Sequence, residues 1–574
     1  MSEVPVADLV LYNAKITTFA EPSHRSPGAQ SIAVKDGRVL AVGSDAELAP
    51  LAAAARHTAD LGGRRVIPGL NDSHVHAMRA GLTWSRTLHW EDVRTLDDAL
   101  GRVRQATAER APGEWICVIG GWHSRQLREG RLPTRAELDA VAPDNPVYLQ
   151  ELYSAAVLNS SALARCGWDS ATADPPGGQL LRDAAGCLTG EVHGMGAFNV
   201  PMALADAGLV GTGLAGTGLG RPVQDNTADL EEQIRGTASM MAAFAGHGLT
   251  GVIDAGGMAT APRDYDALYE LWRRGGLTVR TRLFVCTWTP GREVGDYAQL
   301  TTVGQPDFGD PMLKVSGAGE MPHSGCHDFE GLNPEFAISD AAYAELLEIT
   351  RLCAGHGWRM SVHTVLDRSL ARVLDAWEQV ERETGRISRL RYSIVHADGA
   401  SEASLRRVAA LRAGVLVQNR LLLQGADYVR AWGQAAADAA PPLGIMRRLG
   451  ITVGGGTDAT RANRYSPWAS IWWLVTGRSI DGATQRQEED LMSRYDAIAS
   501  YTRDAAWFTG EDGWRGRLSP GYDADICVPG ADPFECPESE LPDLMSDLTI
   551  VGGRVTHASG DFAALRTRLA ADIG

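Results

Sequence analysis

The segment Val66-Ile-Pro-Gly-Leu-Asn-Asp-Ser-His74-Val-His76 holds the most specific pattern in this chain of 574 residues. An apolar strand ends there, a Pro-Gly turn follows, and two histidines stand at positions i and i+2. On an extended backbone these positions project from one face, so both imidazoles can reach one metal ion. Taken alone, such a pair is common and indicates only two surface histidines, so its meaning depends on the rest of the chain.

Short apolar strands alternate with helical patterns through the middle of the chain. Such alternation predicts a parallel sheet, and eight repeats of it favour a closed (β/α)8 TIM barrel over an open sheet. The first strand is expected at Arg65–Ile67, shortly before His74. The other seven are expected at Thr250–Asp254, Arg280–Val285, Met312–Ser316, Arg359–His363, Arg391–His396, Val415–Gln418 and Thr452–Gly455.

Both ends of the chain are rich in short strands instead. Asp8–Tyr12 near the start and Leu548–Val551 near the end are examples. This shared pattern predicts that the two ends pair into one small β-sandwich domain, built from residues 1–64 and 515–574. The barrel would then occupy residues 65–514.

The connection between the first and second barrel strands is too long for an ordinary loop. Residues 83–230 are therefore expected to form a large insertion that folds over the active face. Within it, Gly208–Gly220 is low in complexity and formally contains a GxGxxG motif. No strand precedes that motif and no acidic residue follows at the expected place, so a mobile loop or lid is favoured over a dinucleotide site.

Four more residues of metal-ligand type lie near the C-terminal ends of predicted strands: Lys314, His363, His396 and Asp458. In a barrel these ends all face one mouth, so residues far apart in sequence can converge there. Each residue alone has an ordinary interpretation, as a packed histidine, an ion-paired lysine or a helix-capping aspartate. The set and its order, on strands one, four, five, six and eight, predict a metal centre.

This order resembles the amidohydrolase superfamily, in which the same series holds one or two divalent ions. More narrowly, the chain resembles the branch that contains N-substituted formamide deformylases, and the likeness extends over nearly the whole chain. The stretches that carry the resemblance are Gly120–His123, Gly130–Val147, Asp174–Gln179 and Gly186–Glu191.

The resemblance assigns roles to the candidate residues. It implies a more buried metal bound by His74, His76 and Asp458, and a second metal bound by His363 and His396. Lys314 would bridge the two ions as a carbamate formed with CO2, because an ammonium group cannot ligate a cation. If Lys314 is unmodified, a single ion is expected. Imidazole and carboxylate ligands suit zinc foremost, and also iron, manganese or cobalt.

The chain departs from that branch where substrate would be recognised. No Asp-Gly pair follows Lys314 closely, and Leu366-Asp367 stands where Gly-Asp usually follows the histidine of strand five. We therefore expect a substrate different from that of the deformylase.

The expected activity is hydrolysis of an amide or formamide C–N bond, cyclic ones included, in a small and partly apolar molecule. Metal-activated hydroxide would attack the carbonyl, and Asp458 would act as general base and proton shuttle. Such proton transfer typically contributes about 10²–10⁴-fold to the rate. The alternatives are ester or lactone hydrolysis, deamination or decarboxylation at the same metals, and a metal-binding protein without catalytic activity.

Further side chains are candidates for the pocket, with ordinary packing as the competing interpretation. Those that could contact substrate are Trp122, His123, Glu191, His323 and His327. The two histidines His323 and His327, spaced at i and i+4, could instead add a metal ligand. Tryptophans that could line an apolar pocket are Trp84, Trp468, Trp472 and Trp473.

The overall composition excludes several classes of protein. Acidic residues outnumber basic ones 71 to 54, and a net charge of −17 argues against a nucleic-acid surface. No stretch approaches the roughly 20 apolar residues of a membrane span, and the N-terminus lacks a signal-peptide pattern. Eight cysteines without a CxxC pair indicate reduced thiols. We expect a cytoplasmic protein with a small-molecule substrate, and the resemblance implies a homodimer.

Overall fold

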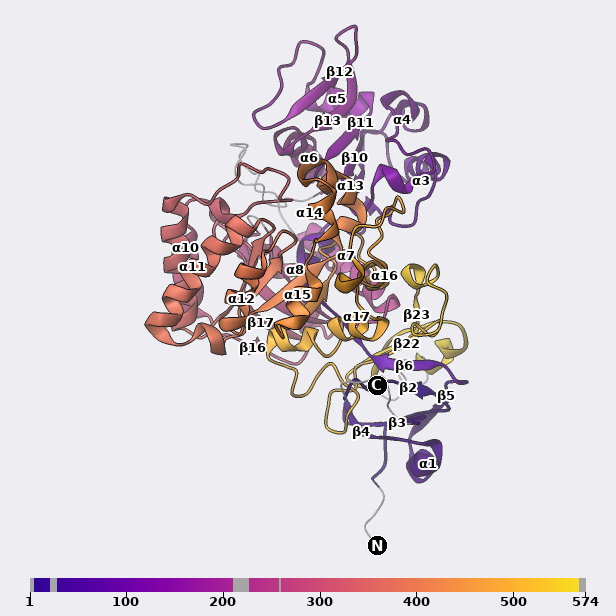
Figure 1. Ribbon diagram of the computed structural model, residues 1–574. Helices are drawn as coiled ribbons and strands as arrows, with labels where there is room; N and C mark the ends of the chain where they lie inside the picture. Colours follow the sequence, from indigo (N-terminus) through magenta and orange to yellow (C-terminus); the bar gives the residue numbers. More distant parts are fainter. Residues whose placement is uncertain (1–4, 21–27, 210–226, 258–259, 567–574) are drawn as a thin grey trace.

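The computed structural model describes residues 5–20, 28–209, 227–257 and 260–566. Three groups of strands are evident in Figure 1: an inserted sheet at the top, an α/β body in the centre, and small sheets from both chain ends at the bottom. Most of the glycine-rich stretch predicted as a lid, residues 210–220, lies outside the described residues. Within the described ranges, no helix has the length and apolar character needed to cross a bilayer.

The central body is a nearly closed barrel of eight parallel strands, which confirms the predicted fold class. In spatial order the strands are β7 (Leu70–Val75), β14 (Leu249–Asp254), β15 (Arg280–Val285), β17 (Leu313–Ala318), β18 (Arg359–Thr364), β19 (Ser393–His396), β20 (Gly414–Gln418) and β21 (Val453–Gly456). A short strand, β16 (Phe308–Gly309), pairs antiparallel with β17. The ring closes between β21 and β7, where the Asp458 amide donates to the His74 carbonyl at 2.9 Å.

The position of the first barrel strand corrects the sequence-based expectation. Residues Arg65–Pro68 form β6, which pairs with strands of the small sheets and not with the barrel. The barrel begins only with β7, and Gly69 stands at the crossing between the two sheets. A Cβ atom at Gly69 would lie 2.1 Å from Thr250 Cγ2 on β14. Only glycine therefore lets the chain pass so close to the neighbouring barrel strand.

Helices pack around the outside of the barrel. They include α7 (Thr227–Gly246), α8 (Asp266–Arg273), α9 (Glu293–Val303), α10 (Asp340–Gly355), α11 (Asp367–Thr384), α12 (Glu402–Ala410), α13 (Arg420–Trp432), α15 (Leu443–Arg448) and α16 (Pro467–Thr476). Helix α10 shows why such segments are helical. The Ser339 hydroxyl caps its N-terminus by accepting from the Ala342 amide, and Leu346, Ile349 and Cys353 repeat at helical spacing on the buried face.

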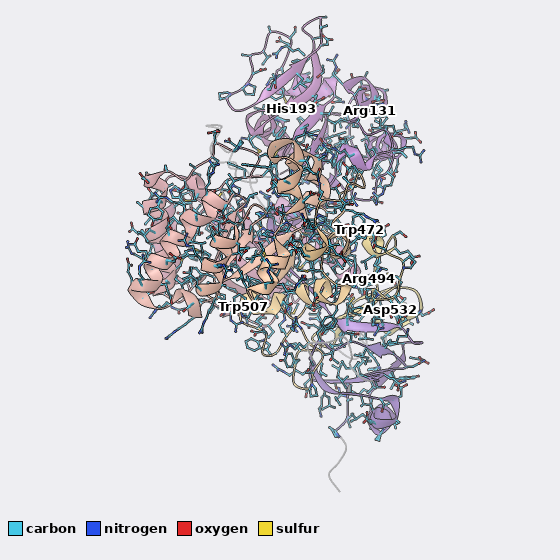
Figure 2. All side chains as sticks on the ribbon, viewed as in Figure 1. Arg131, His193, Trp472, Arg494, Trp507 and Asp532 are labelled. Carbon is cyan, nitrogen blue, oxygen red and sulfur yellow. The ribbon has the colours of Figure 1, made fainter. Side chains whose placement is uncertain are left out.

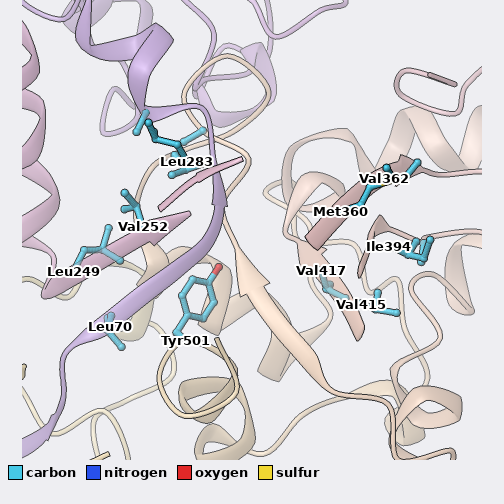
Figure 3. Packing of buried hydrophobic residues seen from close by; sticks show 14 of the residues in the cluster. Leu70, Leu249, Val252, Leu283, Met360, Val362, Ile394, Val415, Val417 and Tyr501 are labelled. Carbon is cyan, nitrogen blue, oxygen red and sulfur yellow. The ribbon is translucent and has the colours of Figure 1, made fainter. Parts of the chain in front are cut away.

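Alternate residues of the barrel strands pack in two separate cores. Val252, Leu283, Ile394 and Val415 join the large cluster between strands and helices, and Figure 3 shows these side chains close up. Their neighbours in sequence, Ile253, Phe284, Val395 and Leu416, join a smaller cluster that includes Phe508. This alternation is the period of a strand, and it assigns the smaller cluster to the barrel interior.

The inserted sheet has six strands, in the spatial order β12 (Gln179–Arg182), β13 (Leu188–His193), β11 (Ala155–Leu158), β10 (Val147–Glu151), β9 (Ile116–Ile119) and β8 (Thr87–Leu88). Helices α3 (Leu96–Glu109), α4 (Arg135–Val141), α5 (Ser160–Cys166) and α6 (Met195–Leu209) accompany it. All these elements lie within residues 83–230, the range predicted for the insertion. The exact domain bounds stay a prediction.

Strands from both ends of the chain share one five-stranded sheet. Its order is β2 (Lys15–Ile16), β6 (Arg65–Pro68), β22 (Ile526–Pro529), β23 (Ser546–Val551) and β24 (Arg554–Ala558). A second sheet holds β4 (Arg38–Gly43), β3 (Ser31–Lys35), β1 (Leu9–Tyr12) and β5 (His57–Asp60). The Arg494 guanidinium donates to the Pro533 carbonyl at 3.0 Å, next to Asp532 (Figure 2). Asp532 in turn pairs with Arg65 at 2.8 Å, so these bonds join the body to the sheet.

Candidate metal centre

His74 and His76 stand where β7 meets a short helix, α2 (Ala77–Gly81). Both side chains are buried, and their ring centroids lie 5.4 Å apart. The Nδ1 atom of His76 lies 2.7 Å from the Gly256 carbonyl oxygen. A carbonyl oxygen only accepts, so Nδ1 carries the proton and Nε2 presents a lone pair, as in histidines that bind metals.

Asp458 follows β21, the strand next to β7 at the closure of the barrel, and its carboxylate lies beside the same two histidines. Its Oδ1 atom lies 3.1 Å from His76 Nε2 and 3.6 Å from His74 Nε2. The preceding glycine run lets β21 come this close to β7, because a Cβ atom at Gly456 would lie 2.8 Å from the Cβ atom of His74. Asp458 itself has a φ of 57°, a left-handed conformation that aspartate tolerates better than most residues.

His363 and His396 come from the ends of two neighbouring strands, β18 and β19. Both are buried, and their ring centroids lie 4.4 Å apart. His363 Nε2 lies 2.8 Å from the Phe329 carbonyl oxygen and donates there, while Nδ1 faces the Glu320 carboxylate at 3.4 Å. The structure therefore brings together five of the six residues predicted for the metal centre.

The sixth acidic or basic group in the cluster is Glu320, which the sequence reasoning missed. Its Oε1 atom lies 3.3 Å from His76 Nε2, and its Oε2 atom lies 3.4 Å from both His74 Nε2 and His363 Nδ1. Ligand atoms of His74, His76 and Glu320 all lie within 4.8 Å of one another, and those of Glu320, His363 and His396 do too. One carboxylate thus belongs to two candidate metal sites. The available signal was an acidic residue just beyond the true end of strand four.

Lys314 does not reach this cluster, which corrects the expected bridge. It is the second residue of β17, near the start of the strand, whereas Glu320 follows the end of the strand at Ala318. Four residues of strand span roughly 13 Å. Lys314 Nζ instead lies 2.9 Å from Glu511 Oε1, within an ion-paired group that also contains Arg282 and Arg515. Its ammonium group already has a buried anionic partner there.

The cluster fits a divalent cation. Burial opposes the charge of His74, yet Glu320 and Asp458 outweigh it and raise the pKa of His74 to about 10. Burial likewise opposes the charge of Glu320, but the imidazoles of His74, His76 and His363 outweigh it and hold the pKa of Glu320 well below its ordinary value. Within the described part of the chain, His74 Nε2 and His396 Nδ1 are buried and have no hydrogen-bond partner. Two carboxylates among unpartnered imidazole nitrogens form the donor set that zinc and related ions prefer.

A cavity of about 300 Å³ opens beside the cluster. Its apolar lining comes from Met78, Leu82, Met195, Met321, Phe329 and Ala462. Its other polar lining residues include Arg79, Tyr153, Asp264, Glu330 and Arg461. Tyr153 and Met195 belong to the inserted segment, so that segment supplies part of the wall.

His327 lines this cavity, but His323 does not. The His327 ring stacks on His363 with centroids 3.8 Å apart, and burial together with His363 lowers the pKa of His327 to about 3. Its Nδ1 atom accepts from the Phe329 amide at 3.1 Å, so the neutral ring carries its proton on Nε2. His323 pairs with Glu345 at 3.2 Å, and neither residue belongs to the cavity lining.

The remaining candidates for substrate contact lie outside the set of cavity-lining residues. Trp122 is fully buried and donates to the Gln150 carbonyl at 2.9 Å. His123 lies 3.2 Å from Glu151. Glu191 pairs at 2.7 Å with His193, which Figure 2 labels in the inserted segment. The expected pocket tryptophans Trp84, Trp468, Trp472 and Trp473 all pack within the main apolar cluster or against it.

Comparisons with known proteins place the chain among amidohydrolases. The model of the amidohydrolase family matches residues 57–557. N-substituted formamide deformylase from Arthrobacter pascens is 26% identical over 566 residues, covering 95% of this chain and 97% of that protein. The putative amidohydrolase YtcJ from Bacillus subtilis is 24% identical over 94% of this chain and 98% of its own.

Solved structures share the fold at low sequence identity. An uncharacterized metal-dependent hydrolase from Pyrococcus furiosus superposes with a TM-score of 0.63 at 20% identity, covering 92% of this chain and all of that one. Atrazine chlorohydrolase TrzN from Arthrobacter aurescens, complexed with zinc, gives a TM-score of 0.51 at 15% identity, over 99% of this chain and all of its own.

Proposed function

This chain belongs to the amidohydrolase family, and we propose that it is a metal-dependent hydrolase that cleaves the C–N bond of an amide or formamide. The observation that carries the proposal is the carboxylate of Glu320, which lies within 3.4 Å of imidazole nitrogens from three histidines at the barrel mouth. The cavity beside it is of the size and partly apolar character of a small-molecule site. The similarity to the N-substituted formamide deformylase supports a formamide or a related amide as the class of substrate.

Two sets of residues would hold divalent ions. His74, His76, Asp458 and Glu320 form one set, and Glu320, His363 and His396 form the other. Glu320 belongs to both sets and would take the role that the sequence resemblance gave to a carboxylated Lys314. One or two ions are therefore proposed, zinc foremost, with no modification of Lys314.

A divalent ion, when bound, polarises a carbonyl group and makes water a stronger acid. The side chains of the protein would transfer the proton and orient the substrate. Asp458 lines the cavity, where its carboxylate accepts a proton from the attacking water and passes it to the leaving nitrogen. His327 carries a proton on Nε2 at the cavity wall, so it can donate to the substrate carbonyl oxygen and orient it.

The test begins with metal content. The purified protein is stripped with a chelator, reloaded with Zn²⁺, and analysed for bound ions, and it is then assayed against formamides, simple amides and matched esters. We expect one to two ions per chain and release of amine from a formamide or an amide, with activity lost on stripping and regained on reloading. A chain that retains no ion, or that cleaves only the esters, would overturn the proposal.

A further inference from the structure

Arg79 places a guanidinium group in the cavity without a carboxylate partner. It lines the cavity from α2, three residues after His76. Within the described ranges, its side chain donates one hydrogen bond, to the Tyr153 hydroxyl at 3.3 Å. Among the residues that the structure describes, no aspartate or glutamate oxygen lies within 4.0 Å of it. Arg280, Arg282 and Arg420, which are buried in the barrel, each pair with a carboxylate, whereas the buried Arg464 and Arg486, outside this cavity lining, do not pair with one in the described part of the chain.

An unpaired guanidinium is costly in a partly enclosed site, so a ligand that supplies the missing charge gains affinity there. Glu320 and Asp458 are close enough for their charges to act on the pKa of Arg79. Those two carboxylates carry a total charge of −2, which one divalent ion cancels and a second ion exceeds. With an ion bound, Glu320 and Asp458 would therefore offer Arg79 no net negative charge. The buried Asp254 is also near enough for its charge to act on Arg79, but it forms no ion pair with it among the described residues.

We infer that the substrate is an N-acyl amino acid or a similar amide with a free carboxylate near the scissile bond, and that Arg79 binds this carboxylate. The inference rests on the proposed hydrolase function. The planar guanidinium presents parallel N–H groups that match the two oxygens of a carboxylate. The Tyr153 hydroxyl, which also lines the cavity, accepts from the guanidinium at 3.3 Å and so helps to hold it there. Met78, Leu82 and Met195 leave room beside it for an apolar side chain.

Two probes separate charge recognition from chemistry: N-formylphenylalanine and N-formylphenethylamine. Both contain the same formamide and aromatic ring, and only the first has the carboxylate. We expect the Zn²⁺-loaded protein to favour the acid. Arg79→Met should then lower kcat/KM for the acid by about 10- to 100-fold, the range for a charge-assisted hydrogen bond, mainly through KM. The neutral probe should change little.

Further variants separate charge from shape. Arg79→Lys keeps the charge and should recover part of the lost kcat/KM, whereas Tyr153→Phe should raise KM for the acid by less than Arg79→Met does. Arg104→Gln removes one positive charge from an exposed position on α3 and serves as the matched control. Equal kcat/KM for the two probes in the unsubstituted protein would overturn the inference.

A binding measurement gives a readout that does not depend on turnover. Calorimetry compares 3-phenylpropanoate with 3-phenylpropanamide, on the unsubstituted protein and on Arg79→Met. We expect the acid to bind about 10- to 100-fold more tightly, and the difference to disappear in the variant. If neither formamide is hydrolysed while this dependence on Arg79 holds, the proposed function fails and the carboxylate site stands. If a formamide is hydrolysed and the acid binds both proteins equally, the function stands and the inference fails.

Discussion

The Lys314 ammonium lies 2.9 Å from the Glu511 carboxylate, near the start of the barrel strand whose far end leads to Glu320. Lys314 and Glu320 therefore lie at opposite ends of one strand. We expect Glu320→Ala to lose at least one equivalent of bound Zn²⁺, because the carboxylate belongs to both candidate sites. Lys314→Met should bind as much Zn²⁺ as the unsubstituted protein. Elemental analysis checks both, and loss of zinc from Lys314→Met alone would restore the carbamate hypothesis.

Asp458→Asn keeps the shape of the side chain and removes its ability to take a proton. We expect kcat per bound ion to fall by about 10²–10⁴-fold, the usual contribution of general acid–base catalysis. Activity must be normalised to the measured zinc content, because Asp458 Oδ1 also lies 3.1 Å from His76 Nε2 and belongs to the proposed ligand set. A fall in activity that merely follows the fall in zinc would leave Asp458 as a ligand only.

Glu511→Gln should destabilise the fold strongly. The Glu511 carboxylate is buried and contacts Arg282, Arg515 and Lys314 at distances of 2.6 to 3.0 Å. Removing one partner of a buried ion pair typically costs about 3–5 kcal/mol. Urea unfolding measures the change. Glu535→Gln, at an exposed carboxylate that pairs with Lys15, is the control and should unfold as the unsubstituted protein does.

The same group gives a pH dependence with a definite sign. Burial opposes the charge of Glu511, but Arg515 and Arg282 outweigh it and hold the pKa of Glu511 well below its ordinary value of 4.5. A carboxyl group with a lowered folded-state pKa stabilises the fold fully above the unfolded-state pKa. We therefore expect the stability difference from Glu511→Gln to be constant from pH 7 to about 5, and to shrink as the pH falls below about 4.5. A difference that grows towards acid pH would contradict this assignment.

Asp427 ties the inserted segment to the barrel helix α13. Its Oδ1 atom lies 2.9 Å from Arg125 Nη2, and its Oδ2 atom lies 3.7 Å from His123 Nε2. Asp427→Asn should loosen this contact and speed amide exchange around Ser124–Gln126 by about tenfold or more, since charged hydrogen bonds contribute about 1.5–3 kcal/mol. Hydrogen exchange with mass spectrometry locates the change. Arg430→Gln also removes a partner of Asp427, but one on α13 itself, and should leave exchange in that segment unchanged.

The sequence predicted those features that depend on local pattern. Seven barrel strands were expected within a few residues of their observed bounds, and the histidines at their ends meet because parallel strands end at one mouth. The first strand was missed because β7 consists mostly of polar residues, which do not form the apolar pattern of a buried strand. Its Asp72 accepts from the Thr457 amide and hydroxyl, and its Ser73 donates to the Gly455 carbonyl. Tertiary partners that satisfy these groups cannot be read from a local pattern.

Glu320 was missed for a related reason. Strand four was expected to end at Ser316, but β17 continues through Gly317 to Ala318. Gly317 is neither clearly apolar nor polar, so the alternation of residue types does not mark where this strand ends. The ligand position therefore lies at Glu320, two residues past Ala318, and not at Lys314, the second residue of the strand. Tyr153 and Arg79 meet only through the placement of the insertion, which no spacing rule fixes.

The five-stranded sheet sets an order for synthesis and folding. Strand β6 lies between β2 and β22, so one of its edges can pair early with β2, while the other edge must wait for β22, which is made near the end. On the ribosome, the first 68 residues emerge while nearly 460 residues, up to β22, are still to be translated. A chain released before Ile526 would keep β6 as an open edge, ready to pair with another chain.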